Sequence, residues 1–358
     1  MSKPILSLLL CGALLPVVVA GCRKDSPPEA IEIKTYTNGW KTEDTDYVRF
    51  RTPLLEDQGV LMREMEALLK AKDYAAIEKR VAEYRRTKEE FLNGITKLQV
   101  AYMGLGWVPG SEADWRAKNQ LLQQWRKKHP QSLTAQIALA SNYIAGVWFV
   151  KNSGHNAVER DRLWKQRWKA MGAVFNESYR SGKPLLEWLL LAQQSVNGYP
   201  DSRKTFDKFT QEAVNDYGNV TQVHLYAVQN LTQINGGKPG QWQAYAAKIA
   251  NQLKGEAGDR FYAQAVWFLP KGAKSKQSAD LKSFDWPRAK RGFELLMNEN
   301  PQNPESVAGP YAVAAWHARD RQTLKLLFEK HIGKRIDNSA WETISDFLAA
   351  RRWAMRKE

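Results

Sequence analysis

The sequence predicts an all-α protein, an α-α superhelix built from irregular helical repeats, with a short extended segment on its N-terminal side. From Leu54 onward, apolar residues recur at spacings of three and four, the periodicity of amphipathic helices. Short turns with Pro or Gly separate the helical stretches, and the pattern returns about every 35 to 45 residues, as in α-solenoids. Apolar runs that alternate with helices are not found, which excludes the nucleotide-binding folds of the Rossmann type.

Residues 1–21 predict a secretory signal. Lys3 precedes an apolar run from Ile5 to Ala20, which is shorter than the about 20 apolar residues of a membrane span and ends in small residues. The stretch Val19-Ala20-Gly21-Cys22 resembles a bacterial lipobox, the peptidase recognition sequence that ends in a lipid-modified cysteine. An ordinary signal peptide that happens to contain Cys22 is the alternative.

The lipobox resemblance implies that Cys22 is the first residue of the mature chain and carries acyl chains. Several acyl chains, at about 0.8 kcal/mol for each buried methylene, would hold the protein stably in a membrane. Arg23 follows Cys22, whereas an Asp at this place favours retention in the inner membrane of enteric-type bacteria. The resemblance therefore implies the outer membrane, facing the periplasm.

The only other cysteine, Cys11, lies within the predicted signal. The mature chain would then have no free thiol and could form no intrachain disulfide. This excludes thiolate catalysis and metal sites with cysteine ligands.

The chain is strongly basic, with a formal net charge of +15. Removal of residues 1–21, in which Lys3 is the one charged residue, changes this charge from +15 to +14 and leaves 337 of the 358 residues. A basic chain favours an acidic partner, but the secretory signal argues against nucleic acid. The polyanions of the envelope are anionic lipid head groups, lipopolysaccharide and cell-wall polymers. A solvated basic surface without such a partner is the alternative.

Residues 22–53 predict a tether and an extended strap. Residues 23–30, RKDSPPEA, are charged and Pro-rich, which is typical of a flexible tether. In residues 31–53, β-branched residues alternate with others, and a second strand-like run includes Tyr47, Val48 and Phe50. The pattern leaves open a small hairpin or an extended strap on the helical body.

Residues 54–358 predict one α-helical repeat-like domain. Three apolar stripes between Leu61 and Tyr102 indicate the first helices, and a basic amphipathic helix is expected after residues 152–156. Residues 270–283 have several Lys and Ser and no apolar stripe, which predicts an exposed loop. The other expected helices are 112–128, 132–150, 184–196, 202–215, 219–233, 240–254, 256–268, 287–299, 304–318, 320–331 and 338–355.

Two stretches are similar to tetratricopeptide repeats. Ala289, Phe293, Leu296 and Pro301 match the spacing of that family's second helix and closing proline, because a small residue lets two helices approach while an aromatic fills the gap. The first helix of the family is matched by Leu139, Ala140 and Tyr143.

The tetratricopeptide resemblance is degenerate and covers only part of the chain. Pro310 stands where the family has an aliphatic residue, and Gly218 stands in place of a proline. The chain thus resembles bacterial lipoproteins with irregular helical repeats. An irregular helical bundle is the alternative fold.

Fourteen tryptophans are spread from Trp40 to Trp353. Their even spread is typical of large core anchors in a helical array. Stacking platforms for sugars are the alternative.

A candidate binding segment interleaves cations and tryptophans, with Arg162, Trp164, Lys165 and Trp168 as its central residues. Such a surface would suit an anionic glycan or lipid. On a helix, however, both tryptophans share one stripe with Met171 and leave the cations on the other side. A core-facing stripe opposite a solvated basic face is therefore the favoured interpretation.

Asn176-Glu177-Ser178-Tyr179 resembles the Glu-Ser pair of lytic transglycosylases, in which the Glu is a general acid within a cleft. The Gly-Leu-Met-Gln motif that follows this pair in the family is absent here.

No catalytic residue, metal site or cofactor is predicted. Gly236-Gly237-Lys238-Pro239-Gly240 lacks the Ser or Thr of a phosphate loop and predicts an interhelical turn. The five histidines include no pair at metal-ligand spacing on one helix face, and a Gly-x-Ser-x-Gly elbow is absent.

These observations favour a lipid-anchored envelope protein that binds another protein or peptide in a helical-repeat groove. The alternative is a peptidoglycan-binding or glycan-binding protein, or a cell-wall lytic enzyme. A third hypothesis is that the basic surface contacts anionic lipid and orients the body.

Overall fold

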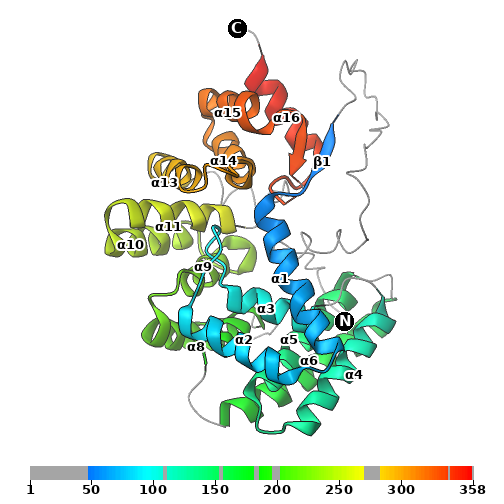
Figure 1. The fold of residues 1–358 in the computed structure, drawn as a ribbon. Coiled ribbons are helices and arrows are strands. Elements are labelled where there is room, and N and C mark those ends of the chain that lie inside the picture. Colours follow the sequence, from blue (N-terminus) through cyan, green and yellow to red (C-terminus); the bar gives the residue numbers. More distant parts are fainter. Residues whose placement is uncertain are drawn as a thin grey trace, which may run out of the picture. The chain divides into compact units, whose positions relative to one another are not determined.

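The computed structural model describes residues 47–107, 111–152, 156–180, 185–195, 202–269, 283–337 and 339–356. Within these residues the fold is all-α with irregular helical repeats, and its only sheet has two short strands (Figure 1). The predicted fold class is therefore confirmed. The predicted signal peptide, Cys22, the tether and most of the predicted loop 270–283 lie outside the described residues.

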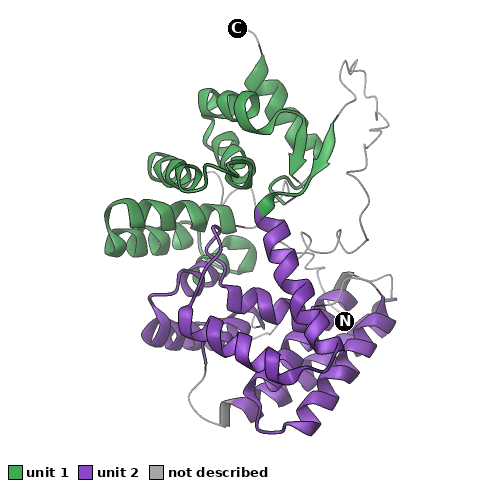
Figure 2. Cartoon of the chain, in the orientation of Figure 1, with its two compact units in different colours: residues 1–53, 227–358 green, residues 54–226 purple. Residues whose placement is uncertain are grey.

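The described chain forms two compact units where the sequence predicted one domain (Figure 2). Unit 2 comprises residues 54–226, and unit 1 comprises residues 47–53 together with 227–356. The helix α9, Thr221–Asn230, crosses the boundary. The other helices of unit 2 are α1 Pro53–Lys70, α2 Tyr74–Thr87, α3 Lys97–Gly106, α4 Glu112–Lys128, α5 Leu133–Asn152, α6 Ala157–Arg180, α7 Leu186–Ser195 and α8 Ser202–Tyr217.

Helix α5 is the centre of unit 2, and it packs against α3, α4, α6 and α7. Its stretch Leu133–Val150 is the one described helical stretch long and apolar enough to cross a membrane. However, 78% of that stretch is buried inside the protein, which is the burial of a core helix. The helix is apolar all round because its neighbours cover it on several sides.

Side-chain hydrogen bonds to the backbone fix the start of helix α4. Helix α4 begins after Ser111, whose hydroxyl accepts from the backbone N–H of Asp114, while the Asp114 carboxylate accepts from the backbone N–H of Ser111. This capping box satisfies donors that the first turn leaves open. The bounds of α4, Glu112–Lys128, are those that the sequence predicted.

Unit 1 stacks its helices in chain order, and each one packs on the next (Figure 1). A short 3-10 turn, Gln233–Asn235, precedes them. The elements are β1 Val48–Phe50, α10 Gln241–Leu253, α11 Gly255–Phe268, α13 Trp286–Asn298, α14 Glu305–Ala318, α15 Arg321–Leu327, the π-helical turn η3 Phe328–Ile332, β2 Arg335–Asp337 and α16 Ile344–Met355.

Residues 47–52 form an extended strap on unit 1. Strand β1 pairs in parallel with β2, and Val48 is opposite Arg335. Tyr47 is buried, and its ring meets that of Phe347 edge-on at 5.8 Å between centroids. The Tyr47 hydroxyl also accepts from Nη1 of Arg351 at 3.2 Å. The described end of the predicted strap is extended, and its partner strand comes from the C-terminal part of the chain. Residues 22–46 of the predicted tether and strap lie outside the described residues.

Two predicted helices at the C-terminal end needed correction. The stretch predicted as helix 338–355 becomes helical only at Ile344, where the Thr343 hydroxyl accepts from the backbone N–H of Asp346. Strand β2 and a turn precede it, and sequence periodicity alone did not indicate them. In the stretch predicted as helix 320–331, the α-helix ends at Leu327 and a π-helical turn follows.

Three of the α13 residues that carry the tetratricopeptide resemblance lie in the helix packing of unit 1. Ala289, Phe293 and Leu296 of α13 are buried, and the ring of Phe293 stacks on Tyr311 of α14 at 5.0 Å. On the same face Gly292 approaches α11 so closely that a Cβ there would overlap the carbonyl oxygen of Asp259. The small residue permits the close approach of two helices, as it does in helical repeats.

The tryptophans of the described residues belong to the interior or its margin. None of them is fully exposed, which fits their interpretation as core anchors. The buried ones are Trp125, Trp168, Trp188, Trp242 and Trp341, and the half-buried ones are Trp107, Trp115, Trp148, Trp164, Trp267, Trp286, Trp316 and Trp353.

Candidate functional site

Helix α6 carries the four side chains of the candidate binding segment. Trp168 is buried, and its ring meets the half-buried ring of Trp164 at 5.6 Å between centroids. Arg162 and Lys165 are exposed, and each pairs with a carboxylate of the same helix, at 2.6 Å and 2.7 Å respectively. The structure does not bring the four together as one exposed site, because the tryptophans face the core and the cations face solvent.

Arg167 is a cation of α6 that is buried and does not lie on the solvated basic face that the sequence predicts. Its side chain is only 3% exposed. Its guanidinium donates to the carbonyl oxygen of Gly146 at 2.6 Å and to both carboxylate oxygens of Glu112 at 2.5 and 2.6 Å. It also lies over the ring of Trp115, 3.7 Å from the centroid. Position 167 is four residues before Met171, so helical spacing alone already puts it on the buried stripe.

Glu177 does not lie in the surroundings that the transglycosylase resemblance requires. Its side chain is 52% exposed and forms an ion pair with Arg126 of α4. A general acid of this kind needs a hydrophobic, water-poor site. Beside it, Ser178 is buried, and its hydroxyl accepts from Nε1 of Trp188 at 2.8 Å. These two residues therefore hold helices together in the described structure.

A buried polar network in unit 2 centres on Glu187 at the start of α7. Its side chain is completely buried. One carboxylate oxygen accepts from Nε and Nη2 of Arg85 at 2.9 and 2.5 Å and from the hydroxyl of Tyr102 at 3.2 Å. The other oxygen is buried with no hydrogen-bond partner among the described residues. The network joins α7 to α2 and α3, across 102 positions from Glu187 to Arg85 and 85 positions to Tyr102.

The charges in this network perturb the groups around Glu187. Burial raises the pKa of Tyr102 well above its ordinary value, and the negative charge of Glu187 acts in the same direction. For Arg85, burial acts to lower the pKa, but the hydrogen bonds and charge of Glu187 outweigh it and the pKa is raised. Tyr102 is thus held neutral and Arg85 charged, which suits a structural ion pair.

The network continues from α2 to α5. Glu78 of α2 accepts from the hydroxyls of Ser132 and Thr134 at the start of α5, the second at 2.5 Å. A carboxylate at a helix N-terminus is also favoured by the helix dipole. The sequence carried a signal for the centre of this network, because Glu187 is the only charge in the apolar run from Leu185 to Leu191. A lone charge in such a run must be paired when it is buried.

Lys118 is a second buried cation of unit 2. Its ammonium donates to the carbonyl oxygens of Gly104 and Trp107 at 3.2 and 2.7 Å, at the C-terminal end of α3. It also pairs with Glu66 of α1 at 3.3 Å. Burial acts to raise the pKa of Glu66, but the positive charges of Lys118 and Lys70 outweigh it and the pKa lies below its ordinary value. The ammonium thus stabilises one helix end and ties it to α1.

Polar contacts in unit 1 join helices that are close in sequence. Asp259 of α11 pairs with Arg288 and Arg291 of α13, at 3.3 and 2.6 Å. Lys290 of α13 reaches Asp320, the residue before α15, at 3.1 Å. Burial acts to raise the pKa of Asp320, but the backbone N–H of Thr323, which it caps, and Lys290 outweigh it and lower the pKa.

The remaining candidate motifs are placed as parts of turns and helices. Gly236 and Gly240 have positive φ of 86° and 77° in the turn before α10, as expected for an interhelical turn. His224 is buried, and its Nε2 lies 2.8 Å from the carbonyl oxygen of Gly218. Within the described ranges, no group of three or more His, Cys, Asp or Glu is placed to hold a metal ion.

No protein-family model, curated protein or solved structure matches the chain. The lipoprotein and tetratricopeptide resemblances therefore stay predictions from the sequence. The described geometry is a helical framework held together by buried polar networks, in which Glu187, Arg167 and Lys118 are buried charges.

Proposed function

We propose that the protein is a lipid-anchored envelope protein that binds a partner protein or peptide along the stacked helices of unit 1. The anchor is the acylated Cys22, and the membrane is the outer membrane with the protein facing the periplasm. The observation that supports binding is the stacking of α10, α11, α13, α14 and α15 in chain order. Such an array places side chains of successive helices along one extended surface, which suits an elongated partner.

The exposed side chains of this array include both polar and apolar ones. Lys248 of α10, Asn298 of α13 and Gln322 of α15 are exposed. Leu253 at the end of α10 and Leu326 in α15 are apolar and about half exposed, at 50% and 46%. A partner with polar groups and a few apolar anchors fits these faces, since interfaces combine apolar contacts with a polar rim.

Photo-crosslinking in cells tests the partner. A photoreactive residue is placed at Lys248, Asn298 or Gln322 of the full-length chain, and at Lys79 on α2 of unit 2 as a control. We expect the same protein to be crosslinked from at least two of the three unit 1 positions and not from Lys79. Equal crosslinking from Lys79, or no protein crosslink at all, would contradict the proposal.

Metabolic labelling with a palmitate analogue tests the anchor separately. We expect label in the wild-type chain and none in Cys22→Ala. Unlabelled wild-type protein would show that residues 1–21 act as an ordinary signal.

The alternative of a cell-wall binder or lytic enzyme makes different predictions. It requires crosslinks to glycan and sedimentation with purified peptidoglycan. Its enzymatic form also requires release of soluble muropeptides that is lost in Glu177→Gln. The exposed ion pair of Glu177 with Arg126 gives this alternative less support than the helical array gives partner binding.

A further inference from the structure

The strap and the C-terminal end of unit 1 carry a strong excess of positive charge. This region, called the cap, comprises residues 47–53, 319–337 and 339–356. It has eleven Lys and Arg residues against five Asp and Glu. The cations are Arg49, Arg51, Arg319, Arg321, Lys325, Lys330, Lys334, Arg335, Arg351, Arg352 and Arg356, and the acids are Asp320, Glu329, Asp337, Glu342 and Asp346.

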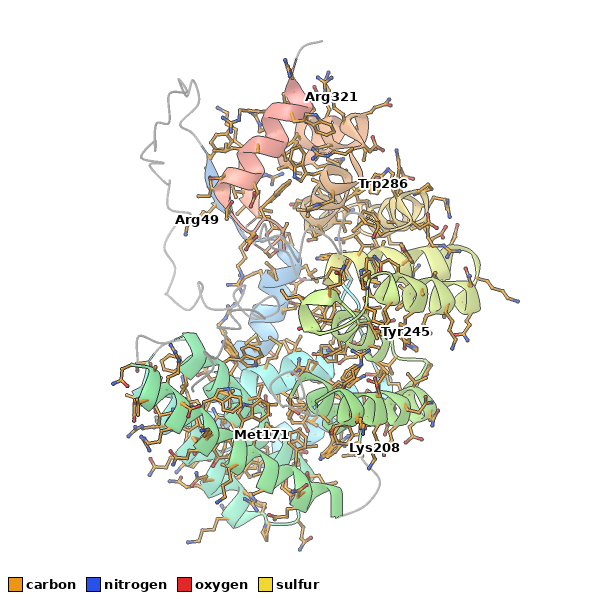
Figure 3. The ribbon with its side chains drawn as sticks, turned by 180° about the vertical axis from the view of Figure 1, so that it is seen from behind. Arg49, Met171, Lys208, Tyr245, Trp286 and Arg321 are labelled. Atoms are coloured by element: carbon orange, nitrogen blue, oxygen red, sulfur yellow. The ribbon has the colours of Figure 1, made fainter. Side chains whose placement is uncertain are left out.

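Three arginines surround the strap itself, which forms an edge of the two-stranded sheet. Arg49 and Arg51 are exposed and alternate with Phe50, so they leave the strap on one side and Phe50 on the other. Arg335 of β2 is exposed, and its guanidinium lies 4.7 Å from the centroid of the Phe50 ring. Figure 3 shows Arg49 on the outer side of β1, away from the helices. We call Arg49, Phe50, Arg51 and Arg335 the strap edge.

A neighbouring histidine lies within the field of two of these cations. His331 precedes β2, and its backbone carbonyl accepts from Arg335 at 2.6 Å. Burial lowers the pKa of His331, and the positive charges of Lys330 and Arg335 lower it further, against a smaller opposite effect of Glu305. Cations therefore outweigh acids in the field around β2.

The strap edge lies close in sequence to the proposed lipid anchor. Tyr47 is 25 residues after Cys22. A chain of this length spans at most about 90 Å even when fully extended. Because this chain links the strap edge to the lipid anchor, the effective concentration of the strap edge at the membrane is on the order of millimolar. A weak attraction is then enough to keep the surface on the bilayer.

We propose that the strap edge binds the head groups of an anionic phospholipid membrane, the same membrane that holds the acyl chains of Cys22. This proposal rests on the lipid anchor of the proposed function. The chemistry is that of an interfacial contact made along the strap. Arg49 and Arg51 on one side and Arg335 on the other pair with phosphates, and the Phe50 ring lies beside Arg335. Since several acyl chains already anchor the protein, the second contact fixes the orientation of unit 1.

Helix α6 carries a second exposed basic surface. Its exposed Arg162 and Lys165 are paired with carboxylates one turn away on the same helix, which reduces their net attraction for phosphate. Arg160 and Lys169 of α6 are also exposed. These two provide a matched control, because their replacement removes the same charge from a different surface.

Vesicle binding of the mature chain tests the proposal. The chain carries Cys22→Ser so that no acyl chain contributes, and the vesicles contain phosphatidylcholine with or without phosphatidylglycerol. We compare Arg49→Gln/Arg51→Gln with the control Arg160→Gln/Lys169→Gln. Each cation at an anionic surface strengthens binding about five-fold, so the strap variant should bind about 30-fold more weakly. The control variant should bind like the parent chain.

Further measurements distinguish a charge contact of the strap edge from other causes of weaker vesicle binding. Arg335→Gln alone should weaken binding about five-fold, and added salt should weaken binding of the parent chain. Equal losses in the strap variant and the control, or equal binding to vesicles without phosphatidylglycerol, would overturn the proposal. Missing palmitate label at Cys22 would overturn only the anchor, whereas matching vesicle curves would overturn only the strap contact.

Discussion

The polar contacts that stabilise each unit internally differ in how far apart in the sequence their residues lie. In unit 2, buried polar contacts connect residues that are far apart in the sequence: Arg85 with Glu187 across 102 positions, and Thr96 with Gln222 across 126. In unit 1, the corresponding contacts span about one helix pair, such as the 29 positions between Asp259 and Arg288. Consecutive helices pack on each other in both units, and unit 2 adds buried polar contacts between segments that are distant in the sequence.

The strap is the exception within unit 1. The hydrogen bond from Arg351 to Tyr47 spans 304 positions. A helical array built from neighbouring contacts leaves its terminal helix with one face uncovered. Tyr47 contacts Phe347 of the terminal helix α16 and thereby covers part of that face. The repeat-like unit 1 therefore has a distant segment at its end, whereas in unit 2 distant segments meet in buried polar contacts in its interior.

The largest effect is expected from Glu187→Gln, which removes the charge at the centre of the distant network in unit 2. Loss of one partner from a buried ion pair costs about 3 kcal/mol or more, because the other charge remains partly buried without compensation. Arg85 keeps 28% exposure, so we expect the lower end of that range. Urea unfolding measures the change, and hydrogen exchange in α2 and α7 assigns it to unit 2.

Glu177→Gln is the matched control for this substitution. It changes the same residue type in the same unit, but the carboxylate is half-exposed and its pair with Arg126 lies at the surface. We expect a loss of less than about 1 kcal/mol. Similar losses in the two variants would show that the buried network contributes no more than a surface pair.

A smaller effect is expected from Gly292→Ala, which tests the close contact between neighbouring helices in unit 1. A Cβ at this position would overlap the backbone carbonyl of Asp259, so α11 and α13 must separate. We expect a loss of about 2 kcal/mol, the typical cost of overpacking. Thermal or urea unfolding gives the value.

Gly172→Ala on α6 is the control for the glycine substitution. A Cβ there meets no atom within 4 Å, so the helix gains the better propensity of Ala without a clash. This change should stabilise the protein by about 0.5 to 1 kcal/mol. If both variants shift stability in the same direction, the close contact of α11 and α13 is not the cause.

Most of unit 1 could be predicted from the sequence because its helices pack on their neighbours in the chain. The spacing of Ala289, Phe293 and Leu296 indicates a packed helix face, and turns with Gly or Pro mark its neighbours. Strand β2 was missed, since three residues are too few for a period and its partner lies almost 290 positions earlier. The predicted helix 338–355 was therefore too long at its start.

The buried cations and carboxylates of unit 2 could be predicted only in part. The positions of Arg167 and Glu187 on apolar stripes indicate burial, but their partners lie on other helices and leave no local pattern. Periodicity shows which face of a helix is buried and not which distant helix covers it. For this reason the sequence placed the tryptophan stripe of α6 correctly and missed Arg167 as its polar member.

The smallest effect we predict concerns one histidine from each unit. The pKa of His224 in unit 2 is lowered by burial, and the pKa of His331 in unit 1 is lowered by burial and by the charges of Lys330 and Arg335. Both folded states disfavour the protonated ring. Each histidine therefore stabilises its unit above the ordinary pKa of about 6.5, and this contribution is lost as the pH falls through that value toward the folded pKa.

Arg335→Gln separates the two causes at His331. Removal of this charge should raise the pKa of His331 and leave that of His224 unchanged, because His224 is lowered by burial alone. NMR titration of the ring resonances measures both values in one sample. Lys330→Gln should act in the same direction without disturbing the hydrogen bond from Arg335 to the backbone of His331. If neither substitution raises the pKa of His331, burial alone lowers it, and the cations at this end of unit 1 are screened by solvent.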